Sequence, residues 1–254
     1  MRAPLFSSDV GEGPVVVLVH GVGIGSWAFA DVAAALAADH RVLVPDRRGY
    51  GPVAAVPVTA TLRAQVGDLL GVLADRGVAE ATWVGVSGGA TLVLALAMTA
   101  PEVVRAAVVH EPAFGPLAPD LHAVLAAAAS RLAASPAGAE GVLDFMAGLI
   151  GEEQLAALPA SAREAIGRRS DVIRAEVPTF VDFAPSAADL AGLADVALTA
   201  TVGSASPHWR RLAAAALGAR AGARVEVVEG ARHLPQLEVP AAFEKVIRAA
   251  AGPG

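Results

Sequence analysis

The sequence predicts a doubly wound, mostly parallel α/β sheet with an inserted helical cap. Short apolar segments rich in β-branched residues recur along the 254-residue chain, as expected for parallel strands that are buried on both faces. Alanine-rich segments with helical periodicity separate most of them, and this alternation is typical of a doubly wound sheet. One long central stretch carries helical patterns without a convincing strand, which predicts an insertion.

Six segments have the strand pattern, and five helical segments lie between or after them. The expected strands are 15–20, 41–45, 82–86, 105–110, 197–202 and 224–228. The expected helices are 28–38, 60–75, 91–99, 209–217 and 241–250. Ligands bind beyond the carboxyl ends of the strands in such sheets, so the residues that follow each strand are the first candidates for a functional site.

The chain length suits a single large domain. We expect residues 1–113 and 187–254 to form the sheet core and residues 114–186 to form the cap, with helices over 120–134, 138–150 and 161–176. Apolar side chains of the cap, together with an aromatic residue after the first strand, are candidates for a substrate pocket, although the same spacing also suits packing between helices. These are Trp27, Phe145, Met146, Phe180 and Phe183.

Composition limits the possible partners. With 55% hydrophobic and 17% charged residues the chain should fold rather than stay disordered. A net charge of −6 argues against nucleic acid or an anionic membrane as partner, which leaves a small-molecule substrate. The absence of cysteine excludes disulfides, thiolate metal sites and a cysteine nucleophile. Oligomeric state is not indicated.

Two segments bear on location. The first 14 residues have no apolar run of signal-peptide length, so we expect a cytoplasmic protein. The uncharged stretch Ala81 to Ala100 is long enough to span a bilayer. Its first half has a strand pattern, Ser87-Gly88-Gly89 lies in its middle, and a helical pattern follows, so a buried strand and helix explain it better.

The segment Gly85-Val86-Ser87-Gly88-Gly89 fits the G-x-S-x-G nucleophile elbow. In this motif a serine lies on a sharp turn between a strand and a helix, and the flanking glycines avoid collisions of side chains with both. Such a short pattern also occurs by chance, as a glycine-rich helix start. Here its position between an expected strand and an expected helix makes Ser87 the candidate nucleophile.

A second glycine-rich turn, His20-Gly21-Val22-Gly23, follows the first strong strand. Acyl transfer generates an oxyanion, which two fixed backbone N–H groups stabilise. The amides of Val22 and Gly88 are the candidates for this oxyanion hole, and His20 has a structural role. A tight turn from strand to helix explains the same glycines and is compatible with that role.

His233 is the candidate general base. A serine hydroxyl is a weak nucleophile, so it needs an imidazole to take its proton. Of the six histidines, His233 alone lies after the last expected strand and before the last helix. A single loop histidine is usually only solvated, but its combination with the elbow favours catalysis.

Four segments together, VLVHGVGIGSW, PDRRGYG, WVGVSGGA and VVEGARHLPQLEVPAAF, resemble the α/β-hydrolase superfamily in order and spacing, over nearly the whole chain except the cap. The resemblance implies that Ser87 is the nucleophile, His233 the base, and the amides of Val22 and Gly88 the oxyanion hole. It also implies that 46–51 is a structural loop. Only 14 residues precede the first strong strand, so we expect the antiparallel strands common at that edge of the family to be short or absent.

The chain departs from this pattern at the acid that orients the histidine. The superfamily usually carries it after the strand corresponding to 197–202, where this chain has Gly203-Ser204-Ala205-Ser206-Pro207. Some members, haloalkane dehalogenases among them, carry the acid after the strand corresponding to 105–110, which points to Glu111. That glutamate could instead begin the cap and pair with an arginine.

Other ways of orienting His233 remain open. The base could be a Ser–His dyad oriented by a backbone carbonyl or by Ser206. Asp182 and Asp189, at the cap boundary, are more distant candidates. Asp195 precedes its strand and should lie at the opposite end of the sheet.

The expected function is hydrolysis of a small, fairly apolar carboxylic ester, thioester or lactone through an acyl-enzyme on Ser87, without a cofactor. A serine nucleophile argues against dehalogenation. The alternative is a non-hydrolytic enzyme of the same fold, a cyclase, lyase or acyltransferase, or a ligand-binding relic.

Two further interpretations fit poorly. His110-Glu111 lacks the second histidine of a zinc motif, so no metal is expected. A dinucleotide site at Gly21, Gly23 and Gly25 lacks the glycine or alanine needed at Ser26, and it leaves the elbow and His233 unexplained.

Overall fold

The computed structural model describes residues 8–51 and 60–253. It confirms the predicted fold class: a seven-stranded sheet in the order β1-β3-β2-β4-β5-β6-β7, in which all neighbouring strands are parallel except β1 and β3. The strands are β1 (Ser8–Val10), β2 (Val15–Val19), β3 (Arg41–Val44), β4 (Ala81–Val86), β5 (Val104–His110), β6 (Leu198–Gly203) and β7 (Arg224–Val228). The six expected strands agree with β2 to β7 within one residue at each end. The antiparallel strand β1 has three residues.

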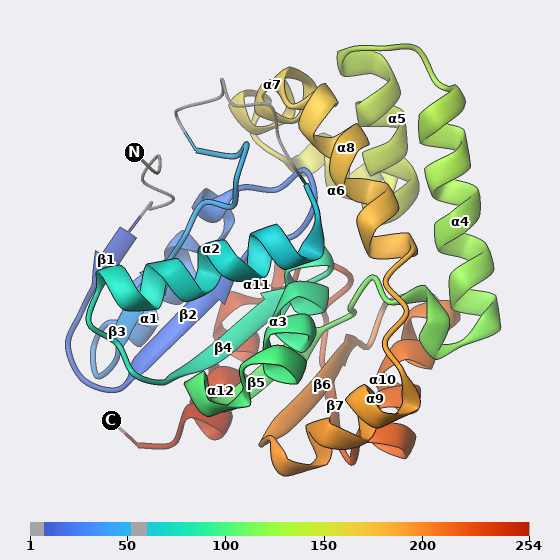
Figure 1. Ribbon diagram of the computed structural model, residues 1–254. Helices are drawn as coiled ribbons and strands as arrows, with labels where there is room; N and C mark the ends of the chain where they lie inside the picture. The colour runs from blue at the N-terminus through green and yellow to red at the C-terminus, as the bar shows by residue number, and fades with distance from the viewer. Residues whose placement is uncertain (1–7, 52–59, 254) are drawn as a thin grey trace.

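Helices cover both faces of the sheet (Figure 1). On one face α1 (Ala30–Leu36) packs against α12 (Pro240–Ala251). On the other, α2 (Leu62–Asp75), α3 (Gly88–Thr99), α9 (Ala187–Gly192) and α10 (His208–Ala221) contact one another in that order. Every residue of β4 is buried, which explains its continuous apolar sequence.

Five α-helices lie between β5 and α9, grouped at one end of the sheet (Figure 1). They are α4 (Pro119–Ala134), α5 (Ala139–Ile150), α6 (Glu152–Ala157), α7 (Ala160–Arg168) and α8 (Ser170–Val181). The single helix expected over 161–176 is two helices, because the chain leaves helical geometry at Arg169, where ψ is 20°. The short helices α6, α9 and α11 (Pro235–Glu238) were not expected. The division into core and cap stays a prediction, and its residues 1–7, 52–59 and 254 lie outside the described part of the chain.

The order of the strands places the site. The chain runs from β2 to β3 on one side and then crosses to β4 on the other, so β2 and β4 flank the point where the winding reverses. Ligands bind beyond the carboxyl ends of the strands at such a point. The uncharged stretch that includes β4 and α3 is split by Ser87. Within the described residues, no helix has both the length and the apolar character needed to cross a membrane.

Candidate active site

Ser87 lies on a strained turn between β4 and α3. Its φ of 57° and ψ of −122° place it in a region that residues with a side chain rarely occupy. Its amide donates to the His110 carbonyl oxygen, and its own carbonyl oxygen accepts from the Thr91 amide. These bonds from β5 and α3 hold the turn, so the hydroxyl of Ser87 is presented at the carboxyl end of the sheet.

The glycines around Ser87 are required by close backbone approach. A Cβ on Gly85 would lie 2.5 Å from the Gly89 carbonyl oxygen, and one on Gly89 would lie 2.2 Å from the Val19 carbonyl oxygen. Both distances are below any real contact, so β4, α3 and the end of β2 can meet this closely only because neither residue has a side chain. The sterics inferred from the G-x-S-x-G spacing are therefore present.

The amides of Val22 and Gly88 are the predicted oxyanion hole. Within the described residues, neither the Val22 amide nor the Gly88 amide donates a hydrogen bond to the protein. The two residues are in contact distance, because a Cβ on Gly88 would lie 3.1 Å from Val22 Cγ2. Such a pair of free donors beside a serine can stabilise negative charge on an oxygen.

His233 and Glu111 form a buried hydrogen-bonded pair. Glu111 Oε2 accepts from His233 Nδ1 at 2.7 Å, and Oε1 accepts from the Gly203 amide at 3.0 Å. Glu111, directly after β5, has a positive φ of 45°, which is rare for a residue with a side chain. Burial by itself raises the pKa of Glu111. The hydrogen bond from His233 and nearby positive charge together lower it by more, so the net pKa lies below the usual value and the carboxyl is ionised.

The Arg210 guanidinium contacts both members of this pair. From the first turn of α10 its Nε lies 3.3 Å from Glu111 Oε2, and its NH1 lies 3.3 Å from His233 Nε2. Burial and then the Arg210 charge lower the pKa of His233 to about 4, against the opposing effect of Glu111. His233 is therefore neutral near pH 7, with its proton on Nδ1 and the lone pair of Nε2 directed at Arg210 NH1.

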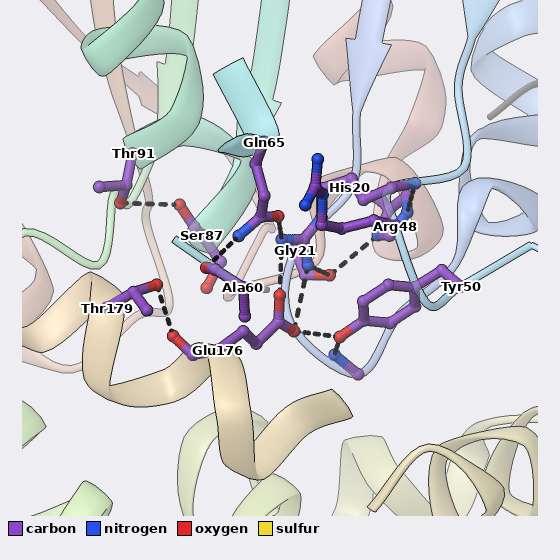
Figure 2. Close-up of polar contacts among 12 residues, drawn as sticks. His20, Gly21, Arg48, Tyr50, Ala60, Gln65, Ser87, Thr91, Glu176 and Thr179 are labelled. Atoms are coloured by element: carbon purple, nitrogen blue, oxygen red, sulfur yellow. Dashed lines mark hydrogen bonds and ion pairs between the residues drawn. The ribbon is translucent and has the colours of Figure 1, made fainter. Parts of the chain in front are cut away.

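A second buried polar cluster ties α8 to the loop that carries Val22. Arg47 NH1 and NH2 donate to the Glu176 carboxylate at 2.8 and 3.2 Å, and Tyr50 also donates to it. Arg47 NH2 donates to the Gly21 carbonyl oxygen at 3.1 Å, and the Gly23 amide donates to the Tyr50 hydroxyl at 2.8 Å. Figure 2 shows Glu176 reaching from its helix toward Tyr50 and Gly21, with Ser87 nearby.

This cluster fixes both residues that flank Val22. The expected structural loop over 46–51 supplies Arg47 and Tyr50. His20 is buried, its Nε2 accepts from the Arg47 amide at 3.0 Å, and burial lowers its pKa well below the usual value. His20 thus bridges the two loops as a neutral group.

Ser87 and the Glu111–His233 pair line one cavity. Its lining includes Ser87, Glu111, His233, Arg210 and Val22, and otherwise it is mostly apolar: Pro112, Ala113, Leu121, Leu125, Ala128, Phe145, Leu149, Val177, Phe180, Val181 and Trp209. The three predicted catalytic residues therefore line one cavity. Three other predicted site residues line it with them: Val22, Phe145 and Phe180.

Three of the predicted pocket residues do not line this cavity. Met146 follows Phe145 on a helix, so it points about 100° away and packs against Gly23. Phe183 stacks on Phe114, with ring centroids 5.0 Å apart, and lines a separate hollow beside α2. Trp27 is 37% exposed. Gly88 lies at the cavity through contact with Phe180 rather than as a lining residue.

None of the other candidates for orienting His233 forms a hydrogen bond to it within the described residues. Ser206 Oγ is buried and has no hydrogen-bond partner among the described residues. Asp189 caps α9 through Ser186, and Asp195 lies before β6, at the amino end of that strand. In the part of the chain that the structure describes, no three histidine or acidic side chains gather in a way that could hold a metal ion.

Sequence reasoning missed Arg210 and the Glu176 cluster. Arg210 follows β6 within one loop and the first turn of a helix, so its place at the carboxyl edge was a usable signal. Glu176 also had a signal in the sequence that could have been used, because it is a carboxylate flanked by apolar residues on an amphipathic helix. Its partner Arg47, 129 positions away, was not readable.

The chain belongs to the α/β-hydrolase family. The family model described as "Alpha/beta hydrolase family" matches residues 16–246, which include most of β2, all of β3 to β7, the elbow and His233.

Several curated proteins match part of the chain. The chain is 33% identical to epoxide hydrolase 3 of Siraitia grosvenorii over 104 residues, covering 40% of this chain and 33% of that protein. It spans between 21% and 38% of the length of five such relatives.

Two solved structures show the same fold over almost the whole chain. The enol-lactonase from Burkholderia xenovorans is 23% identical with a TM-score of 0.74, covering 95% of this chain and 94% of that one. Carboxylesterase CesB from Bacillus subtilis is 21% identical with a TM-score of 0.75, covering 95% and 85%.

Proposed function

We propose that this protein is a serine hydrolase that cleaves a small carboxylic ester, thioester or lactone through an acyl-enzyme on Ser87. The observation that carries the proposal is the buried Glu111–His233 hydrogen bond of 2.7 Å in the same cavity as the strained Ser87. A carboxylate on Nδ1 fixes the tautomer in which Nε2 is a base, which is the arrangement that serine activation needs.

The proposed reaction has two halves. Ser87 Oγ attacks the substrate carbonyl carbon while His233 Nε2 takes its proton, and the amides of Val22 and Gly88 donate to the developing oxyanion. The tetrahedral intermediate collapses, and the leaving oxygen or sulfur takes the proton from Nε2. Water then attacks the acyl carbon, gives its proton to Nε2, and the second collapse returns that proton to Ser87.

The nucleophile argues for acyl substrates among the activities named for similar proteins. Those names include epoxide hydrolase, carboxylesterase and enol-lactonase. A serine that opened an epoxide would become an ether, which water does not readily cleave, whereas its attack on an ester or lactone gives a hydrolysable ester. The mostly apolar lining suits an acyl group of modest size.

One observation favours a second candidate, a non-hydrolytic enzyme of this fold or a ligand-binding relic. His233 Nε2 contacts Arg210 at 3.3 Å, and Ser87 Oγ has no hydrogen-bond partner among the described residues. If Arg210 stayed on His233 Nε2, that nitrogen could not take the proton of Ser87, and the serine would remain a weak nucleophile. Acylation of Ser87 without release of the acyl group would favour this candidate.

The test is the initial rate of hydrolysis of nitrophenyl esters of increasing acyl length. We expect turnover by the wild type and a fall to background in Ser87→Ala, with an optimum at short chains. Equal rates for the two proteins, or no turnover of any ester, would contradict the proposal. Mass spectrometry of the protein after mixing with the ester separates a trapped acyl-enzyme from no reaction.

A further inference from the structure

Arg210 is a buried cation inside a cavity that is otherwise mostly apolar. Its side chain is 6% exposed, and it is the only arginine or lysine that lines the cavity within the described part of the chain. Burial lowers its pKa to about 10, so it still carries its charge near pH 7. A buried charge is costly unless it is paired, which raises the question of what it serves.

The protein satisfies only part of this guanidinium. Nε faces Glu111, NH1 donates to His233 Nε2, NH2 donates to the Leu149 carbonyl oxygen, and the group stacks over the Trp209 ring at 4.3 Å. Arginine has five N–H donors, so one on NH1 and one on NH2 remain without a hydrogen bond to the described residues. Two donors on a planar fork suit the two oxygens of a carboxylate.

The contact between Arg210 and His233 is incompatible with catalysis as it stands. Neutral His233 has one lone pair on Nε2, and NH1 occupies it. Ser87 needs the same lone pair to lose its proton. Arg210 must therefore turn away before the proposed reaction begins, and a stronger acceptor than imidazole would favour that turn.

A carboxylate is such an acceptor, because hydrogen bonds between two charged groups are about twice as strong as neutral ones. The Nε contact with Glu111 can persist while NH1 turns, so Glu111 keeps the guanidinium at the site. The movement needed is a rotation of the side chain, not of α10.

We propose that Arg210 binds a free carboxylate on the substrate, so that the preferred substrates are esters, thioesters or lactones that carry a second, unesterified carboxyl group, and that this binding releases His233 for Ser87. This inference rests on the proposed function and narrows its substrate class. The apolar lining then contacts the carbon chain between the two carboxyl groups.

The test compares nitrophenyl hydrogen glutarate, which carries the free carboxylate, with nitrophenyl hexanoate, which has a similar length and no charge. We expect wild-type kcat/KM to favour the glutarate ester about ten- to hundredfold, as expected for charge-assisted hydrogen bonds. In Arg210→Gln this ratio should fall to near one. The ratio is the readout because it cancels any general effect of the substitution on the chemistry.

Arg211→Gln is the matched control. Arg211 is the next residue on α10, donates to the Ser204 carbonyl oxygen and does not line the cavity. It should keep the wild-type ratio. If Arg211→Gln loses the ratio as Arg210→Gln does, a general effect of positive charge explains it and the inference fails. If Arg210→Gln does not fold, Arg210→Lys replaces it: the charge without the fork should leave an intermediate ratio, and an unchanged ratio would overturn the bidentate assignment.

A second measurement separates this inference from the proposed function. If the wild type hydrolyses both esters at equal kcat/KM and Ser87→Ala does not, the inference fails while the proposed function stands. If neither ester is hydrolysed, a titration with monomethyl glutarate tests carboxylate binding directly. Tryptophan fluorescence is the signal, because Arg210 stacks on Trp209. Carboxylate binding is supported if the fluorescence change is saturable, is lost in Trp209→Phe, and gives an affinity at least about tenfold weaker in Arg210→Gln. The absence of any fluorescence change in the wild type would overturn the inference.

Discussion

Glu111 Oε2 lies 2.7 Å from His233 Nδ1, although the two residues are 122 positions apart in the chain. Glu111 follows β5 and His233 follows β7, with β6 between these strands. Both loops leave the carboxyl edge of the sheet, so two side chains that reach across the end of β6 can meet there. The Gly203 amide at the end of β6 binds the other oxygen of the same carboxylate.

Glu111→Gln should lower kcat about a hundred- to ten-thousandfold in ester hydrolysis. The amide oxygen can still accept from the Gly203 amide, so its NH₂ group faces His233 Nδ1 and favours the tautomer that lacks a base at Nε2. Steady-state kinetics on the best nitrophenyl ester measure this. A kcat within twofold of wild type would show that Glu111 does not orient the base.

The pH dependence of kcat/KM should report His233. Burial, followed by the charge of Arg210, lowers its pKa to about 4. Activity needs the neutral imidazole, so kcat/KM for a neutral ester should be constant near neutral pH and fall as pH drops through about 4. In Arg210→Gln the lost positive charge raises the pKa, which moves this acid limb to higher pH. Arg211→Gln should leave it in place, and a wild-type limb near the usual histidine value would contradict the burial of this base.

The strain at Ser87 predicts a difference in stability between two inactive variants. Its φ of 57° and ψ of −122° are unfavourable for any residue with a Cβ and accessible to glycine. Ser87→Gly should therefore have a free energy of unfolding about 1 kcal/mol higher than that of Ser87→Ala, after the entropy cost of glycine. Urea denaturation of both proteins measures this. A less stable glycine variant would show that the turn carries no strain.

The Arg47–Glu176 pair predicts a loss and a rescue. Glu176→Leu leaves the buried Arg47 charge without its carboxylate, which should lower the free energy of unfolding by about 3–5 kcal/mol. The double variant with Arg47→Leu removes both charges and should recover most of that loss. Its kcat should stay at least about tenfold below wild type, because Gly21 loses the hydrogen bond that holds the loop of Val22.

A surface pair serves as the control for that cycle. Arg168 and Glu164 pair on α7 with both side chains mostly exposed, so Glu164→Leu should change the stability by about 0.5 kcal/mol or less. If the free energy of unfolding falls equally in the Glu176 and Glu164 variants, burial does not raise the cost of breaking the Arg47–Glu176 pair. Wild-type kcat in the double variant would show that the cluster has no effect on the oxyanion loop.

Local sequence determined the elements and the elbow. Continuous apolar strands such as β4, and the glycines at Gly85 and Gly89, follow from burial on both faces and from a turn too tight for a Cβ. These are constraints between near neighbours, so their pattern is visible in the chain itself. His233 was recognisable for a similar reason, since its position between the last strand and the last helix is a matter of order.

Tertiary structure alone decided which distant groups meet. The sequence offered Glu111, Ser206 and cap aspartates as partners of His233, and only the arrangement of β5, β6 and β7 as parallel neighbours brings one carboxylate within hydrogen-bond distance. Arg210 against His233 Nε2, and Arg47 against Glu176, join segments that no periodicity connects. A buried charge needs a partner in space, and the sequence records the charge but not the partner.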